Sequence, residues 1–328
     1  MATYKEINGT SVQNVAGDPS NPVAGEVWYN STTTTFKIRK TAQVSSWATG
    51  SNLNTARFFL AGAGTQTAAL AFGGKGASFY NTGDTEKYNG SSWTEVNNMN
   101  TGRNRVAGAG TQTSALVFGG IISYPGNSNA TEAYNGTNWT EVNNLNTARY
   151  GATGCGASNT AALAFGGEVP GNTAATETWN GTNWNSVNSL NQARMYMAGC
   201  GTNTAALATG GWAGAFALTE IWNGTNWTEV GDLNTARLMF AAAGTNTAAI
   251  VFGGDDRSPS NITNKTELWN GTSWTEVNNL NTARSRLAGA GTDAVALAFG
   301  GGEPNGTTGF TEEWAEGPAT VTSTLEQN

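Results

Sequence analysis

The apolar positions of this chain fall in short runs that recur along most of its length. After Arg149, small and apolar residues fill RYGATGCG and TAALAFGG, and the aromatic-containing runs ATETWN and NWTEVNNL follow. Polar turns separate these runs, and no helical periodicity longer than one turn competes with them. Each copy of the pattern therefore predicts four short β-strands. An Asn-Gly pair lies between the last two runs and predicts a two-residue hairpin turn, because both residues can adopt positive φ.

The pattern repeats every 45 residues or so, roughly the length of a propeller blade. Each copy begins with one arginine and later carries a diglycine and a Thr-Glu pair. The repeat arginines are Arg57, Arg103, Arg149, Arg194, Arg237 and Arg284, and the Thr-Glu glutamates are Glu86, Glu132, Glu177, Glu220, Glu267 and Glu312. Four antiparallel strands at this period are typical of a β-propeller. Small residues in the first two strands suit the crowded axis, and Trp and Tyr in the last two suit the wider space between blades.

The copies predict a closed ring. The last copy ends after a third strand at Trp314, whereas the chain begins with an unattached fourth strand, SSWATGSNL, at Trp47. Joining the two gives an all-β, six-bladed propeller over residues 44–316, with four antiparallel strands per blade and a closing blade shared by both chain ends. Such closure removes exposed sheet edges. Residues 1–43 form an N-terminal arm with a candidate hairpin from Trp28 to Ile38, and residues 317–328 form a C-terminal tail.

The order of the repeated residues resembles the kelch repeat. That family has a glutamate and a tyrosine, a turn, a tryptophan, an arginine-containing loop and a diglycine, and Glu132, Tyr134, Trp139, Arg149 and Gly166-Gly167 follow in this order. The match recurs over residues 44–316 and implies a kelch-type propeller, although the NGTNW turn is shorter than in the family. A shared fold does not by itself imply an activity.

A second resemblance concerns the N-terminal segment. NPVAGEVWYNSTTTTFKIRK, followed by kelch-like repeats, is similar to virion proteins of tailed bacteriophages, particularly marine ones. This resemblance implies a virion protein whose residues 1–43 contact other virion proteins or further copies of the chain. The start lacks the charged and apolar regions of a secretory signal, which fits release by lysis. A cytoplasmic location is the alternative.

Composition excludes several function classes. The net charge is −7 and the 16 basic residues are scattered, which disfavours nucleic acid. No apolar run approaches the length of a membrane span. Histidine, the commonest general base and metal ligand, is absent. We therefore predict a protein that is not an enzyme and has no cofactor or metal, although a carboxylate pair for glycoside hydrolysis stays open. Cys155 and Cys200 replace repeat alanines and are predicted to be small core residues.

The repeat arginines and glutamates have two interpretations. They can lock each blade internally, which we favour because six equivalent copies suit architecture, or they can form a ring that binds an anion. Differences between copies are more informative about function. The connections between second and third strands vary, and so do the residues after each repeat arginine. Alternating strand direction places both sets on one face, around the mouth of the central channel.

This face is the predicted binding surface. The candidate residues are Phe79, Tyr80, Tyr124, Tyr150, Tyr196, Trp212, Phe216, Asp255, Asp256, Arg257 and Phe310. Aromatic rings with neutral polar neighbours suit a glycan or a protein receptor on a host surface. The chain is thus predicted to be a tail-fibre, receptor-binding or surface-decoration protein. A lectin-like or protein-interaction propeller unrelated to virions is the alternative, and unselected drift of the loops is also open.

Overall fold

The computed structural model describes residues 12–20, 26–123, 126–213, 217–256, 262–303 and 306–324, and within these ranges it contains strands and turns but no helix. The predicted all-β class is therefore confirmed. By its internal contacts the chain divides into two units. The larger is Ser46–Ala315, and the smaller combines Met1–Ser45 with Glu316–Asn328.

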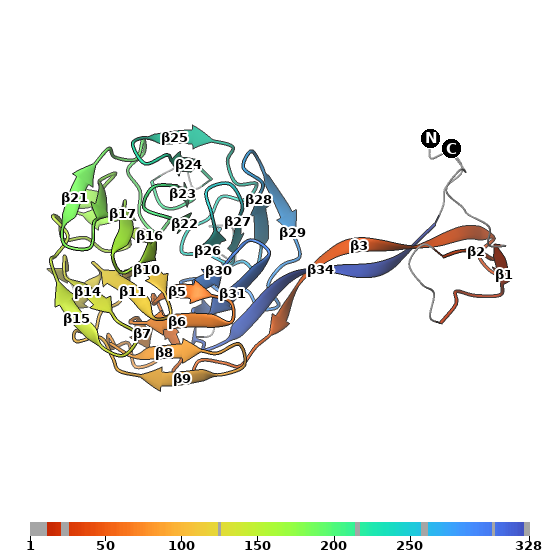
Figure 1. Cartoon of the computed structure of the whole chain (residues 1–328), viewed down its shortest axis with the longest axis horizontal. Helices are drawn as coiled ribbons and strands as arrows, with labels where there is room; N and C mark the ends of the chain where they lie inside the picture. Colours follow the sequence, from red (N-terminus) through yellow and green to blue (C-terminus); the bar gives the residue numbers. More distant parts are fainter. Residues whose placement is uncertain are drawn as a thin grey trace. The chain divides into compact units, whose positions relative to one another are not determined.

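Five four-stranded antiparallel sheets repeat along the larger unit, each with its strands in chain order (Figure 1). Sheet 1 contains β5 (Ala61–Thr65), β6 (Ala68–Phe72), β8 (Thr85–Tyr88) and β9 (Trp93–Val96); sheet 2 contains β10 (Ala107–Thr111), β11 (Ser114–Phe118), β14 (Thr131–Tyr134) and β15 (Trp139–Val142); sheet 3 contains β16 (Thr153–Ser158), β17 (Ala161–Phe165), β20 (Thr176–Trp179) and β21 (Trp184–Val187); sheet 4 contains β22 (Ala198–Gly201), β23 (Ala206–Thr209), β24 (Thr219–Trp222) and β25 (Trp227–Val230); sheet 5 contains β26 (Ala241–Gly244), β27 (Ala249–Phe252), β28 (Thr266–Trp269) and β29 (Trp274–Val277). Repeated four-stranded sheets of this kind are typical of a β-propeller.

A sixth sheet joins strands from the two ends of the chain. Its order is β1-β2-β3-β34-β31-β30, so β3 occupies the place that the fourth strand has in sheets 1 to 5. The Gly50 N–H donates to the Thr311 carbonyl over 2.9 Å, close to where β3 ends. Residues 317–324, predicted as a tail, continue strand β34. The strands are β1 (Gln13–Val15), β2 (Val27–Asn30), β3 (Thr35–Thr49), β34 (Thr311–Thr324), β31 (Val295–Phe299) and β30 (Ala288–Gly291).

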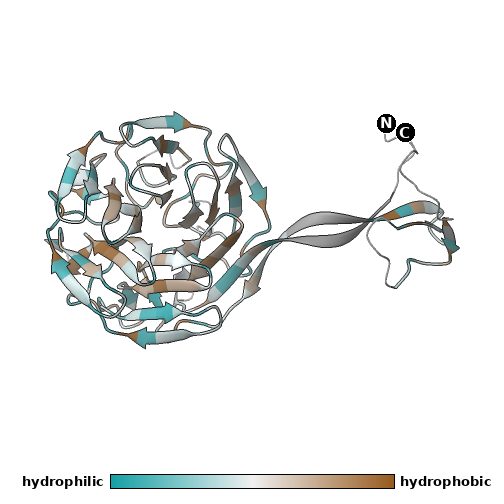
Figure 2. Cartoon of the chain, in the orientation of Figure 1, coloured by the Kyte–Doolittle hydropathy of each residue, from teal (hydrophilic) through white to brown (hydrophobic). Residues whose placement is uncertain are grey.

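The first strands of the six sheets contact one another in the cyclic order β5, β10, β16, β22, β26, β30 and back to β5. Their small residues permit this approach. A Cβ atom on Gly108 of β10 would lie 2.7 Å from Cζ of Phe72, which belongs to the preceding sheet. Figure 2 shows the more hydrophobic residues on the inner strands and the more hydrophilic ones on the outermost strands.

Tryptophan side chains connect each sheet to the preceding one. The indole N–H of Trp139 donates to the Thr85 hydroxyl over 3.1 Å, and Trp93 donates to Thr311 over 3.0 Å. The same bond occurs in the pairs Trp184–Thr131, Trp227–Thr176, Trp274–Thr219 and Trp47–Thr266. Followed from sheet to sheet, these six bonds return to their starting point. Tryptophans of the outer strands thus link neighbouring sheets across the wide spaces between them. The size of these residues had predicted this position.

The turn between third and fourth strands differs from the sequence prediction. It has four residues rather than two, and its Asn135 is not among the residues with positive φ, whereas Gly136 has φ 93°. The Asn135 side-chain oxygen instead accepts hydrogen bonds from the N–H groups of Thr137 and Asn138 at 2.9 and 2.8 Å. The Asn135 N–H still donates to the Asn138 carbonyl at 3.2 Å. The two-residue prediction was wrong because the asparagine side chain accepts the remaining hydrogen bonds of the turn, in place of a positive φ at Asn135.

Three short two-stranded ribbons lie in the connections that follow second strands: β12 (Ile121–Ser123) with β13 (Gly126–Asn127), β18 (Glu168–Val169) with β19 (Gly171–Asn172), and β32 (Gly302–Glu303) with β33 (Gly306–Thr307). In sheet 1 the corresponding β7 (Lys75–Gly76) pairs instead with β4 (Arg57–Phe58), which precedes the first strand.

The smaller unit contains the predicted hairpin. Strands β2 and β3 pair with Val27 opposite Ile38, and β1 adds to β2 in parallel. Asp18 accepts hydrogen bonds from the side chains of Trp28 and Asn30, and its carboxylate pairs with Lys37 at 2.9 Å. The hydrogen bond from Lys37 is the largest cause that lowers the pKa of Asp18.

Candidate functional site

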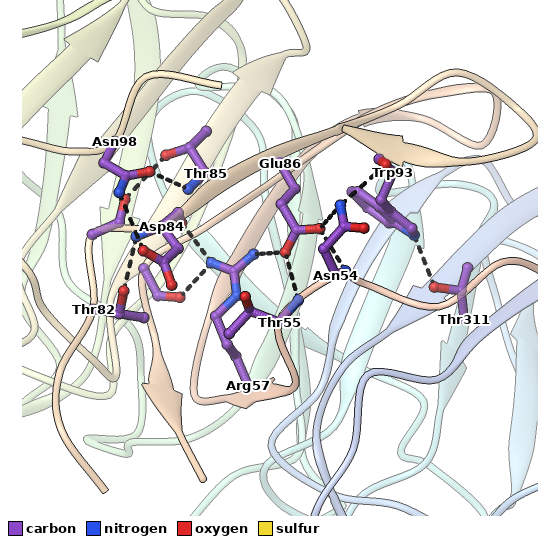
Figure 3. Close-up of polar contacts among 12 residues, drawn as sticks. Asn54, Thr55, Arg57, Thr82, Asp84, Thr85, Glu86, Trp93, Asn98 and Thr311 are labelled. Carbon is purple, nitrogen blue, oxygen red and sulfur yellow. Dashed lines mark hydrogen bonds and ion pairs between the residues drawn. The ribbon is translucent and has the colours of Figure 1, made fainter. Parts of the chain in front are cut away.

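Each repeat arginine forms a buried ion pair with the glutamate of its own copy of the repeat. Arg57 Nη2 lies 2.9 Å from Glu86 Oε1, and both side chains are inaccessible to solvent. Nη1 of Arg57 also donates to the carbonyls of Gly73 and Asp84 (Figure 3). The equivalent pairs are Arg103–Glu132, Arg149–Glu177, Arg194–Glu220, Arg237–Glu267 and Arg284–Glu312. These twelve side chains stabilise the repeat copies to which they belong.

The glutamates also hold the connection that enters each sheet. Glu86 Oε2 accepts a hydrogen bond from the Asn54 N–H at 2.7 Å, and the Asn54 side chain donates in turn to the Trp93 carbonyl at 3.1 Å (Figure 3). Burial lowers the pKa of Arg57, and the charge of Glu86 opposes this change. A buried charge that loses its partner stays desolvated, so each pair is costly to break from one side. The ion pairs are therefore structural elements, with no surface left for an external anion.

The residues that vary after each repeat arginine meet in a closed ring of backbone hydrogen bonds. The Arg105 N–H donates to the Phe59 carbonyl, Gly151 to Arg105, Tyr196 to Gly151, Met239 to Tyr196, Arg286 to Met239, and Phe59 to Arg286, with lengths of 2.7 to 3.1 Å. We call Phe59, Arg105, Gly151, Tyr196, Met239 and Arg286 the mouth ring. All six have positive φ, between 53° and 61°. This conformation lets each carbonyl reach the next sheet.

The mouth ring opens into a channel between the first strands. The channel has a volume of about 150 Å³ and is lined by residues 59–62, 105–108, 151–154, 196–199, 239–242 and 286–289. Below the ring its lining consists mostly of alanine, glycine and other nonpolar side chains. A larger hollow of about 540 Å³ lies beside sheet 1, where Thr55, Ser78, Tyr80 and Asp84 contribute to its walls. The charged side chains that line the channel belong to the ring alone.

The variable connections pair with the variable residues after the repeat arginines, as the strand directions required. Tyr150 bridges Glu168, Met195 bridges Trp212, and Leu238 bridges Asp255. The Tyr150 hydroxyl also donates to the Glu168 carboxylate. Burial, followed by this hydrogen bond, raises the pKa of Tyr150. The two sets of differing residues thus lie beside each other around the channel mouth.

Aromatic and cationic side chains gather over the mouth ring. The rings of Phe59 and Tyr196 stack with centroids 5.8 Å apart, and Tyr150 lies 6.3 Å from Tyr196. The Arg105 guanidinium carbon lies 4.8 Å from the Phe59 centroid and 5.3 Å from that of Tyr150, and Arg286 lies 5.3 Å from Phe59. Burial raises the pKa of Tyr196 to about 12. Guanidinium groups at these distances interact favourably with the electron-rich ring faces.

The described residues of the predicted binding surface fall into three groups. Tyr150 and Tyr196 belong to the aromatic cluster at the mouth. Phe79 and Tyr80 are strongly exposed, 69% and 80%, and Phe79 reaches the cluster through Phe58, 6.2 Å away. Trp212, Asp255, Asp256 and Phe310 lie on the surrounding connections, whereas Tyr124, Phe216 and Arg257 lie outside the described residues.

The sequence prediction missed Phe59, Arg105 and Arg286 as site residues. All three lie at the positions that vary after the repeat arginines, but from these positions only Tyr150 and Tyr196 were chosen as candidates. The signal that finds them is the residue two places after Arg103 and Arg284, which is a second arginine in these copies only. In sheet 3 the equivalent position is Gly151, where a Cβ atom would lie 2.9 Å from the Tyr196 ring.

Both cysteines are free and buried. The Cys155 and Cys200 thiols donate to backbone carbonyls of Thr202 and Thr245 at 3.5 Å. Burial raises the pKa of Cys155 well above its usual value and that of Cys200 to about 12. They fill the core as the repeat alanines do.

No protein-family model matches the chain, and no curated protein matches it significantly. Across the described ranges, no group of three or more cysteine, aspartate or glutamate side chains has the arrangement of a metal site. Within the same part of the chain, no helix is long and apolar enough to cross a membrane.

Proposed function

We propose that Ser46–Ala315 forms a six-bladed propeller of the kelch type, with the closing blade built from both chain ends. Three sets of contacts support this architecture: the first strands, the Trp–Thr hydrogen bonds and the mouth ring. Each set passes through all six sheets and returns to the first. The recurring order of Glu, Tyr, Trp, Arg and diglycine supports the kelch type.

This propeller acts by binding rather than catalysis. The observation that carries the proposal is that shared and differing side chains lie in different places. The side chains shared by all copies form the buried ion pairs and the core, whereas the side chains that differ between copies lie at the channel mouth and on its surrounding connections. Exposed Phe79 and Tyr80 extend this surface outward. A face of exposed aromatic rings and polar groups suits a glycan or a protein receptor on a host surface.

The protein is a component of a tailed-phage virion, as a tail fibre, receptor-binding or surface-decoration protein. The support is the resemblance of the GEVWYNSTTTTFKI segment, which spans the β2–β3 hairpin, to phage virion proteins. In this proposal residues 1–43 attach the propeller to other virion proteins or to further copies. Deleting residues 1–43 should abolish oligomers seen by light scattering, while far-ultraviolet circular dichroism still shows a folded β-sheet protein. A full-length chain that is strictly monomeric at high concentration would contradict self-assembly through this segment.

A glycan array probed with multivalently displayed protein tests receptor binding, since avidity reveals weak single contacts. Binding that is lost in Tyr196→Ala or Trp212→Ala, but kept in Thr137→Ala at the opposite strand ends, supports the loop face. Absence of binding to every glycan refutes the glycan form and favours the alternative, a propeller that binds proteins.

A further inference from the structure

Two arginines at the channel mouth lack the partner that every repeat arginine has. Among the described residues, ion pairs involve the six repeat arginines and Lys37, and none involves Arg105 or Arg286. The Nε atoms of both are buried without a hydrogen-bond partner, as are those of the six repeat arginines, so the missing ion pair is what sets Arg105 and Arg286 apart. The chain holds 23 acidic against 16 basic residues, so carboxylates are not scarce. Two half-buried cations that line the channel mouth without an internal anion are available to an anion from outside.

The carboxylates of the neighbouring connections do not fill this role. Glu168 accepts the hydroxyl of Tyr150, and Glu303 Oε1 has no hydrogen-bond partner within the described part of the chain. Neither forms an ion pair with a mouth arginine there, although both lie on ribbons that pair with the ring segments. Their charges lower the local positive potential without satisfying the guanidinium donors. The guanidinium N–H groups of Arg105 and Arg286 are therefore available to a ligand.

The backbone supports the same interpretation. Arg105 and Arg286 have φ of 53° and 59°, a region that costs a non-glycine residue free energy and that glycine adopts freely. Gly151 shows that the ring accommodates glycine at this position. The chain nevertheless keeps long side chains at the strained positions, and two of them are unpaired cations that stack on the single ring of Phe59.

We propose that the mouth ring binds the carboxylate of one acidic sugar residue, held by Arg105 and Arg286 and flanked by Phe59, Tyr150 and Tyr196. This inference rests on the proposed loop face and names its ligand chemistry. The planar guanidinium matches a carboxylate in two parallel hydrogen bonds. Aromatic faces pack against the apolar C–H face of a sugar ring. The channel volume of about 150 Å³ admits one small group only. Polyanions are disfavoured because the surrounding connections carry Glu168, Asp255, Asp256 and Glu303.

Calorimetric titration of the full-length protein with single sugars tests the proposal. The probes are D-glucuronate and N-acetylneuraminate, with D-glucose as the neutral match and inorganic phosphate and acetate as simple anions. The variants are Arg105→Gln and Arg286→Gln. Lys75→Gln is the matched control, since it removes an equal charge from the same face outside the channel lining. Circular dichroism establishes that each variant is folded.

The expected result is binding of at least one acidic sugar and no binding of glucose. Each arginine variant should weaken that binding by about tenfold or more, because a charged hydrogen bond is lost, while Lys75→Gln leaves it within about twofold. Binding should also weaken as salt rises. Equal affinity for phosphate or acetate would overturn the sugar assignment, and unchanged affinity in both arginine variants would overturn the site. If no acidic sugar binds, the acidic-sugar proposal is refuted. If the protein nevertheless binds neutral glycans on the array, the proposed function is retained.

Discussion

Close contact between sheets predicts a specific steric coupling between Gly108 and Phe72. A Cβ atom added to Gly108 would lie 2.7 Å from Cζ and 3.1 Å from Cε2 of Phe72. Ordinary carbon contacts are about 3.5 to 4.0 Å, so the fully buried Phe72 ring must move by roughly 1 Å. Overpacking of this kind costs about 1–3 kcal/mol. Alanine recovers about 0.4–1 kcal/mol by restricting the unfolded chain. Gly108→Ala should therefore lower the free energy of unfolding by about 1–2 kcal/mol.

One pair of neighbouring sheets already contains a smaller residue at the phenylalanine position and an alanine at the glycine position. Sheet 4 has Thr209 where the other sheets have phenylalanine, and sheet 5 has Ala242 where the others have glycine in the first strand. The Thr209 hydroxyl bonds that of Thr219 at 2.8 Å, and Thr85 is the residue opposite Phe72 in sheet 1. Phe72→Thr alone should cost about 3–5 kcal/mol through the cavity it leaves. In that background Gly108→Ala should cost little, because only the 3.0 Å contact with Ala61 Cβ remains, which gives a coupling of about 1–2 kcal/mol.

Urea unfolding followed by tryptophan fluorescence measures the four members of this cycle. The slope with denaturant must stay constant, so that midpoint changes report stability. Gly76→Ala is the control, because a Cβ there meets nothing within 4 Å, and it should be neutral or stabilising. If Gly108→Ala costs the same with and without Phe72, the steric explanation is refuted.

Three further predictions concern buried polar groups. Arg237→Met should lower the free energy of unfolding by about 3–5 kcal/mol, because it strands the buried carboxylate of Glu267; a loss below 1 kcal/mol in urea unfolding would contradict this. Cys155 and Cys200 should not react with a thiol reagent at pH 8 until the protein unfolds, since both are buried with raised pKa values; two fast-reacting thiols in native protein would refute it. Burial raises the pKa of Tyr196 to about 12, above the unfolded value of about 10. Its contribution to stability is therefore complete below pH 10 and falls from there to about pH 12. Tyr196→Phe should flatten this fall in urea unfolding, and an unchanged pH profile would contradict it.

The sequence alone determined the repeated sheets of this protein. The small first strands, the aromatic outer strands and the unattached strand at Trp47 were readable because each copy repeats the same local preferences. The Asn135 turn was predicted incorrectly because an asparagine supports a turn either through its backbone or through its side chain. Sequence gives no means of choosing between the two when the surrounding loop can have two or four residues.

Which polar groups remain available for function depends on contacts between residues far apart in the chain. Arg103 and Arg105 are two residues apart and have the same side chain. Arg103 is buried against Glu132, whereas Arg105 reaches the channel mouth without a carboxylate partner among the described residues. The difference arises because the backbone turns left-handed at Arg105 to donate its N–H to Phe59 of the neighbouring sheet. That hydrogen bond joins positions far apart in the chain, so local preferences could identify the arginine but not its surroundings.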